Sequence, residues 1–406
     1  MPKGIILVII DSIYFLKLVL LNFLIVNSGW YGGRAITPPL LGSLRYSITI
    51  TCLEFIFVNI FYILLVRNRD ISFTNNNLNL SIQHNKNKDL VYIGYIFVSI
   101  LLAFFIRDNI SVLGIGVKDT PLTENDDNML RTLFSIAVYI AKYFVIGYVT
   151  RYYYLKYSNN SGNIFLFYNF IFVLLINMIF IGQNRMDALL PIISSFILLN
   201  YLYGKKMHFY NIIMFILAFF AIYFISIMRG TFDYSITDDT KSLITDYLQI
   251  YLGGIYNVAL SLEIDQYSNV NNLLIFSYDL IRPFLGLNFL WRSDTILMSS
   301  DLFNYRIFGD PSKVTQIIPL MGQFFLAFGW LGVIISTFIV NLLIFMFLKI
   351  LKNSYIIESV IIIPIIIRLC ITFFQNISIF INELSSIIII FLILKLVTYS
   401  IGIFKK

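Results

Sequence analysis

Long apolar runs separated by short polar loops dominate this chain. Ten runs approach the length needed to cross a bilayer, and none alternates with the period of two that marks a half-buried strand. Backbone polar groups cannot go unpaired in hydrocarbon, so continuous runs predict membrane-spanning helices rather than a barrel. The expected fold is all-α, a polytopic membrane bundle of about ten helices. The runs lie at 5–26, 46–66, 90–106, 132–150, 163–181, 188–203, 209–228, 328–348, 356–377 and 384–404.

One polar stretch, residues 229–313, breaks this pattern in the second half of the chain. It divides the protein into an N-terminal bundle of about seven helices (1–228), a large loop (229–313) and about three C-terminal helices (314–406). Within the loop, residues 241–262 have helical spacing interrupted by Gly253 and Gly254. Because a passive anchor needs no such stretch, we expect it to carry the chemistry.

Composition supports the membrane assignment. Hydrophobic residues make up 59% of the chain, charged residues only 13%, and the mean hydropathy is +0.83. A soluble domain has about 25% charged residues. The formal net charge of +7 follows from loop lysines and arginines, so it predicts topology and gives no reason to expect a nucleic-acid partner.

Basic residues in the loops predict the orientation. If the N-terminus is inside, thirteen fall in inner loops: Lys3, Arg67, Arg69, Lys86, Lys88, Arg151, Lys156, Lys205, Lys206, Lys349, Lys352, Lys405 and Lys406. Six fall in the short outer loops: Arg34, Arg45, Arg107, Lys118, Arg131 and Arg185. The positive-inside rule therefore predicts cytoplasmic termini and places residues 229–313 outside.

Cysteine and histidine positions limit the chemistry. Cys52 and Cys370 both lie in apolar runs, so neither a disulfide nor a structural zinc site is expected. His84 and His208 fall in inner loops, which leaves a carboxylate as the outer general base. The candidates are Asp187, Asp233, Asp279 and Asp310. The sequence contains no motif for a metal, nucleotide or dinucleotide, and we expect no cofactor.

Two arginines lie where apolar runs meet the outer surface. Arg185 is in the short hairpin GQNRMD with Asp187, and Arg229 leaves the seventh run shortly before Asp233. A guanidinium at that level can bind phosphate oxygens through two parallel hydrogen bonds. The structural alternatives are a local Arg185–Asp187 pair and an interfacial anchor at Arg229.

Ionisable residues also occur inside the apolar runs, where they are costly. Arg368 lies near the middle of the ninth run, and its alternatives are an ion pair with a helix such as the one holding Glu54 or contact with an anionic headgroup. The others are Asp11, Lys17, Glu54, Lys142, Glu358 and Lys395, several of them near run ends.

The amphipathic segment 241–262 offers Tyr247, Tyr251 and Tyr256 beside Gly253 and Gly254. Tyrosine presents both an aromatic face and a hydroxyl, which suits contact with a ligand at an interface. We therefore expect a ligand-binding surface here. The alternative is a helix that packs on the transmembrane bundle.

Four segments resemble a known family: GQNRMDALLPII, RGTFDY, YLGGIYNVAL and PLMGQFFLAFGWLGVII. Together they are similar to the Wzy-type O-antigen polymerases, which join oligosaccharide repeat units and carry one large outer loop. The most specific element is Met321-Gly322-Gln323 followed by Phe328-Gly329-Trp330-Leu331-Gly332.

The resemblance implies a metal-independent glycosyltransferase without a cofactor. Its substrate would be an undecaprenyl-pyrophosphate-linked oligosaccharide at the periplasmic face of the bacterial inner membrane. Membrane lipids and a chain-length regulator are the other expected partners. Arginines would stabilise the negative charge that develops on the leaving pyrophosphate. The expected catalytic residues are Arg185, Arg229, Asp187 and Asp233, and the expected substrate-binding residues are Arg282, Arg292, Arg306, Arg368, Tyr251, Gly253, Gly254 and Tyr256.

Two other functions remain open. An O-antigen ligase shares this architecture and donor, but its family uses an outer-loop histidine, which is not predicted here. A flippase for the same lipid-linked unit would more often show more spans, short loops and cations lining a central cavity.

Overall fold

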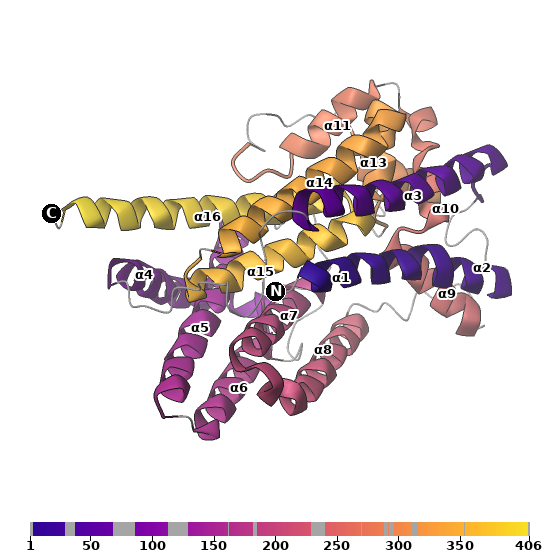
Figure 1. Ribbon diagram of the computed structural model, residues 1–406. Helices are drawn as coiled ribbons and strands as arrows, with labels where there is room; N and C mark the ends of the chain where they lie inside the picture. The colour runs from indigo at the N-terminus through magenta and orange to yellow at the C-terminus, as the bar shows by residue number, and fades with distance from the viewer. Residues whose placement is uncertain are drawn as a thin grey trace.

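The computed structural model describes residues 3–28, 37–67, 86–112, 129–160, 162–181, 185–228, 240–268, 270–287, 291, 296–310, 316–352 and 354–404. Figure 1 shows their arrangement. The α-helices are α1 Lys3–Phe15, α2 Leu21–Ser28, α3 Leu41–Tyr62, α4 Lys86–Ala103, α5 Met129–Asn160, α6 Asn163–Asn177, α7 Arg185–Tyr203, α8 His208–Met228, α9 Thr240–Leu252, α10 Ile255–Ser261, α11 Asn272–Ile281, α12 Ser299–Phe308, α13 Leu320–Phe328, α14 Trp330–Lys352, α15 Ile356–Ile371 and α16 Ile377–Phe404.

Short helical turns and two strands complete the described chain. The π-helical turns are η1 Leu16–Leu20 and η2 Ile63–Arg67. The 3-10 turns are η3 Phe104–Asn109, η4 Gly204–Met207, η5 Ile264–Tyr267 and η6 Thr372–Phe374. Strands β1 Ile110–Val112 and β2 Ile179–Ile181 pair antiparallel.

The predicted all-α membrane fold is confirmed. Eight apolar helical segments within the described ranges are long enough to cross a bilayer: Ile6–Ser28, Leu41–Leu65, Lys88–Asn109, Leu130–Asn159, Ala188–Phe220, Trp330–Lys352, Ile356–Phe374 and Ile377–Ile401.

This count differs from the ten expected runs at two places. The run at 163–181 forms α6, whose 15 residues extend only about 22 Å, followed by strand β2. The runs at 188–203 and 209–228 form two helices of 19 and 21 residues, α7 and α8, which turn at η4 and together make up the single segment Ala188–Phe220 of that count. Gly204 has a φ of 59° in that turn, and the Asn200 and Asn211 side chains exchange two 2.8 Å hydrogen bonds across the helices. Helices α7 and α8 are therefore a paired hairpin.

Helix α15 is the centre of the bundle, with 94% of its apolar stretch buried. Figure 1 shows it between α14 and α1, with α7 below. Contacts with α5, α7 and α14 cover most of it. The α5 contact requires a glycine, because a Cβ at Gly147 would lie 2.8 Å from the Ile357 Cα atom. The expected apolar run at 356–377 is thus a core helix shielded by its neighbours.

A polar network fixes the first turn of α15. Lys88 pairs with Glu358 at 2.8 Å and Arg151 pairs with Asp89 at 3.1 Å. The Tyr355 hydroxyl donates to Asp89 at 2.9 Å. These buried charges are compensated by direct partners, as a low-dielectric environment requires.

The described residues between 240 and 328 form helices α9 to α13, which we call the lobe. The lobe packs against the sides of α2 and α3. Leu252 lies in one buried cluster with Leu21 and Ile25, and Val258 lies in another with Ile50. Figure 1 shows α9 beside α2, and α10 with α13 beside α3. Ile50 is nine residues from the Leu41 end of α3, a distance of about 14 Å along the helix. The lobe therefore lies alongside the ends of the spanning helices and is not a separate domain above them.

Candidate functional site

Helices α13 and α14 form a tight hairpin from the segment that carries the family resemblance. Gly329 turns the chain with a φ of 58° and a ψ of −139°, a conformation that only glycine adopts readily. Gly332 packs on the Phe324 carbonyl, and Gly322 packs on the Ser261 hydroxyl of α10. A Cβ at either glycine would collide with these atoms. The glycines of this motif therefore build the hairpin, while its polar residue, Gln323, is left for other contacts.

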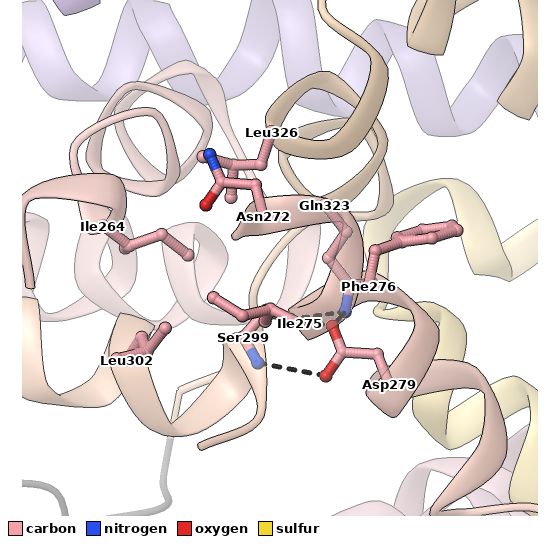
Figure 2. A pocket seen from close by; sticks show the side chains of 9 residues that line it. All are labelled: Ile264, Asn272, Ile275, Phe276, Asp279, Ser299, Leu302, Gln323 and Leu326. Carbon is pink, nitrogen blue, oxygen red and sulfur yellow. Dashed lines mark hydrogen bonds between the residues drawn. The ribbon is translucent and has the colours of Figure 1, made fainter. Parts of the chain in front are cut away.

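Gln323 points into a cluster with Asp279 of α11 and Ser299 of α12. Its Nε2 atom donates to Asp279 Oδ2 at 2.9 Å and to Ser299 Oγ at 2.7 Å. The Ser299 hydroxyl donates to Asp279 Oδ2, and the Ser299 backbone N–H donates to Asp279 Oδ1 at 3.0 Å. All three residues are at least 98% buried. Figure 2 shows them together on one side of the cavity.

Helix N-termini explain why this cluster forms. Ser299 is the first residue of α12, so the Asp279 carboxylate lies at the positive end of that helix dipole. Gln323 Oε1 accepts at 2.8 Å from the backbone N–H of Ile377, the first residue of α16. The Ser378 hydroxyl donates to the Asp279 carbonyl at 3.1 Å. The cluster therefore satisfies buried backbone groups and joins four helices.

A small cavity adjoins the carboxylate. Ile264, Ile275, Leu302 and Leu326 supply apolar walls, and Asn272 lies at the other end of the same face of α11 (Figure 2). The volume is about 10 Å³, close to what one water molecule needs. A carboxylate beside such a cavity can exchange a proton with a small polar group.

Burial raises the pKa of Asp279 to about 6, and the negative charge of Asp301 adds to the effect. The hydrogen bonds from Ser299 and Gln323 act in the opposite direction because they stabilise the ionised form. A carboxylate with a pKa of about 6 is mostly ionised at neutral pH yet binds a proton readily. That property suits a general base.

Several expected site residues lie outside what the structure describes. Arg229, Asp233 and Arg292 are outside the described residues. Arg185 and Asp187 begin α7, but their side chains are not among those described, and the same holds for Tyr247 and Tyr251 in α9. Their assigned roles stay predictions.

Arg306, expected to bind substrate, lies in a buried ion pair. Its Nε and Nη2 atoms donate to Glu263 Oε2 at 3.0 and 2.7 Å. Nη1 donates to the carbonyl and hydroxyl of Thr37, and Nη2 also donates to the Pro38 carbonyl. Glu263 Oε1 accepts from the Leu40 backbone N–H at 2.7 Å. These contacts fasten the segment before α3 to the lobe and use every nitrogen of the guanidinium.

The two other described arginines that were expected to bind substrate, Arg282 and Arg368, differ in their surroundings. Arg282 is exposed, and its guanidinium lies over the Tyr278 ring at 5.5 Å. Arg368 is buried, and its Nη2 atom lies 2.5 Å from Glu383 of α16. The ion-pair alternative is therefore the one observed for Arg368, with a helix other than the one that holds Glu54, which pairs with Lys17 at 3.0 Å. Only the folded arrangement of α1, α3, α15 and α16 decides which charges meet.

The break between α9 and α10 occurs at the expected glycines. Gly253 has a φ of 52°, and a Cβ there would lie 2.8 Å from the Phe374 carbonyl oxygen. A Cβ on Gly254 would collide with the Leu21 side chain. Tyr256 packs against the cluster formed by Leu21, Ile25 and Leu252. The atoms that lie close to the backbone at this break therefore belong to the protein itself. This favours the packing alternative for Gly253, Gly254 and Tyr256.

The sequence identified part of this cluster. Asp279 was one of four candidate bases, and Gln323 belonged to the most specific motif. Ser299 carried no signal, because it lies 20 positions from Asp279 without a recognisable pattern. Comparison with known protein families, with characterised proteins and with solved structures finds no match to this chain.

Proposed function

We propose that this chain is a Wzy-type polymerase that joins undecaprenyl-pyrophosphate-linked oligosaccharide repeat units. The observation that carries the proposal is the position of the family-like segment 319–335. Its glycines build the α13–α14 hairpin, and its Gln323 holds a buried carboxylate whose pKa is raised to about 6. The membrane bundle and the lobe support the same assignment.

In the proposed reaction, Asp279 is the general base. It accepts the proton of an acceptor sugar hydroxyl while that oxygen bonds to the anomeric carbon of the growing glycan. The anomeric C–O bond to the carrier breaks, and undecaprenyl pyrophosphate leaves with the electron pair. Ser299 and Gln323 orient the carboxylate. The water-sized cavity must widen to admit a sugar, and the apolar side chains of Ile264 and Leu302 are the walls that must move.

The two rivals receive less support. A flippase is expected to line a central cavity with cations. Four buried cations among the described residues, Lys17, Arg151, Arg306 and Arg368, each pair with a carboxylate instead. A fifth, Lys142, donates to the Ile179 carbonyl at 2.7 Å. The ligase family uses an outer-loop histidine, and the one described histidine, His208, begins α8 beside the inner-loop lysines. We therefore rank polymerase above both.

The proposal puts the lobe on the periplasmic side of the inner membrane and both termini in the cytoplasm. A periplasm-specific reporter fused after Asp265 should be active, and one fused after Lys206 should be inactive. An inactive Asp265 fusion would contradict the assignment of the lobe to the periplasm.

The glycan ladder of a deletion strain tests the function. A polymerase mutant keeps one repeat unit on its acceptor, whereas a flippase or ligase mutant keeps none. Complementation with Asp279→Asn should leave the single-unit product, since loss of a general base costs about 100-fold or more in rate. Asp108→Asn, at an exposed carboxylate, is the control and should restore the ladder. A full ladder from the Asp279→Asn strain would exclude the carboxylate as base.

A further inference from the structure

An exposed pair of aromatic rings lies on the lobe surface. Tyr267 of η5 and Tyr305 of α12 are 42% and 38% exposed. Their ring centroids are 5.4 Å apart, with an interplanar angle of 78°. The T-shaped contact holds both rings in place and leaves aromatic surface facing out. Such rings bind ligands at low entropic cost because few torsions must be fixed.

Polar side chains surround this pair. Asp265 and Gln266, immediately before Tyr267, are both exposed. The Asn272 amide donates to Asp265 Oδ1 at 2.8 Å, which positions the carboxylate beside η5. A carboxylate and an amide together offer several acceptors and donors at fixed positions. This combination of aromatic surface and directed polar groups matches the two faces of a pyranose, which has apolar C–H faces and a rim of hydroxyls.

The patch is continuous with the cavity that contains Asp279. Ile264 lines the cavity and directly precedes Asp265, while Asn272 lines the cavity and also bonds Asp265. Asn272 and Asp279 are seven residues apart on one face of α11, about 10 Å along the helix, and Figure 2 shows both beside the cavity. Asn272 thus connects the patch to the cavity that contains the carboxylate.

We propose that Tyr267, Tyr305, Asp265 and Asn272 bind a sugar ring of the glycan acceptor. This inference rests on the proposed polymerase function and assigns the acceptor to this patch instead of the α9–α10 break. The tyrosine rings contact the C–H face of the sugar, and the carboxylate and amide bind its hydroxyls.

The competing role is that of a membrane-interface anchor. Tyr46 and Trp330 supply a comparison: they are 57% and 45% exposed, and their rings are 6.2 Å apart at the ends of two spanning helices. Tyr267 and Tyr305 lie outside the eight candidate spans, next to the exposed Asp265. An ionised carboxylate is costly to bring into a membrane, so the exposed Asp265 beside these rings favours an aqueous ligand.

Binding of a soluble glycan tests the proposal. The probe is the repeat-unit oligosaccharide released from the strain's own polysaccharide, free of lipid and phosphate, and titrated by NMR against the full chain in nanodiscs. Tyr267→Ala and Tyr305→Ala should each weaken binding about tenfold. Tyr267→Phe should stay within about twofold, because the ring remains. Tyr46→Ala, the matched control, should bind like the unmodified protein.

Thermal unfolding of each variant checks that the chain is intact, and Tyr267→Phe serves as the folded reference. Equal affinity of the two alanine variants and the unmodified protein would overturn the proposal, as would the absence of binding to the unmodified protein. Failure of the function is distinguishable. A deletion strain with an unchanged ladder, together with tyrosine-dependent binding, would refute the polymerase and keep the glycan site. If the ladder collapses in the deletion strain and both alanine variants restore it, the polymerase function is kept and the glycan site is refuted.

Discussion

Replacing Arg306 should lower the free energy of unfolding. It should not act through weaker substrate binding alone. The Arg306→Ala change removes five hydrogen bonds and leaves the Glu263 carboxylate unpaired at 4% side-chain exposure. Removing one partner of a buried ion pair costs about 3–5 kcal/mol, because the remaining charge stays desolvated. If each kcal/mol moves the unfolding midpoint by about 2 °C, the expected decrease is roughly 6–10 °C.

The assay is thermal unfolding of the purified protein in one detergent, repeated for a double-mutant cycle. Arg306→Met combined with Glu263→Leu removes both charges and should recover most of the loss. Recovery should be incomplete, because the Leu40 N–H and the Thr37 and Pro38 carbonyls lose their partners.

A matched control separates stability from function. Arg282→Ala removes an arginine that is exposed and contacts the Tyr278 ring, so it should cost less than about 1 kcal/mol. Equal midpoints for Arg306→Ala and Arg282→Ala would refute the structural role. An Arg306→Ala protein that is fully stable but inactive would support the substrate-binding role expected from the sequence.

Four further outcomes can be measured. Polymerisation by purified protein should fall about tenfold from pH 7 to pH 5, since Asp279, with its pKa raised to about 6, is about nine-tenths ionised at pH 7 and one-tenth at pH 5; a flat rate profile would argue against this base. The contribution of Asp279 to stability should change in the opposite direction, growing as pH falls through 6, because the folded state binds the proton more tightly than the unfolded state. Gly322→Ala should lower the free energy of unfolding by about 1–3 kcal/mol through its collision with Ser261 of α10, while Gly94→Ala, at a position with open space, should not. Glu54→Gln should destabilise the protein by about 3–5 kcal/mol because it leaves Lys17 charged and fully buried, and an unchanged midpoint would contradict that.

The secondary structure of the bundle was largely predictable from the chain because hydrocarbon allows few alternatives. An apolar run of sufficient length must satisfy its backbone internally, so the helices α3, α4, α14 and α16 fall where the runs predict them. Local chemistry also predicted the break between α9 and α10, since Gly253 adopts a positive φ. The lengths were less predictable: α6 ends early where strand β2 begins.

Which side chains meet was decided by the tertiary structure. The sequence alone left Arg368 with two alternatives and could not foresee Glu383 as its partner, since an ion pair depends on how α15 and α16 pack. For the same reason the sequence predicted substrate binding by Arg306, whereas the structure pairs its positive charge with Glu263.

By itself the sequence determined that the chain is an all-α membrane protein, that a polar stretch interrupts the apolar runs, and that glycines mark the turns. These properties follow from hydropathy and backbone geometry, which act over a few neighbouring residues. The cluster of Asp279, Ser299 and Gln323 brings together residues of three helices that lie 20 to 44 positions apart along the chain. Only tertiary packing brings them together, and only burial in that packing raises the pKa of Asp279 to a value useful for proton transfer.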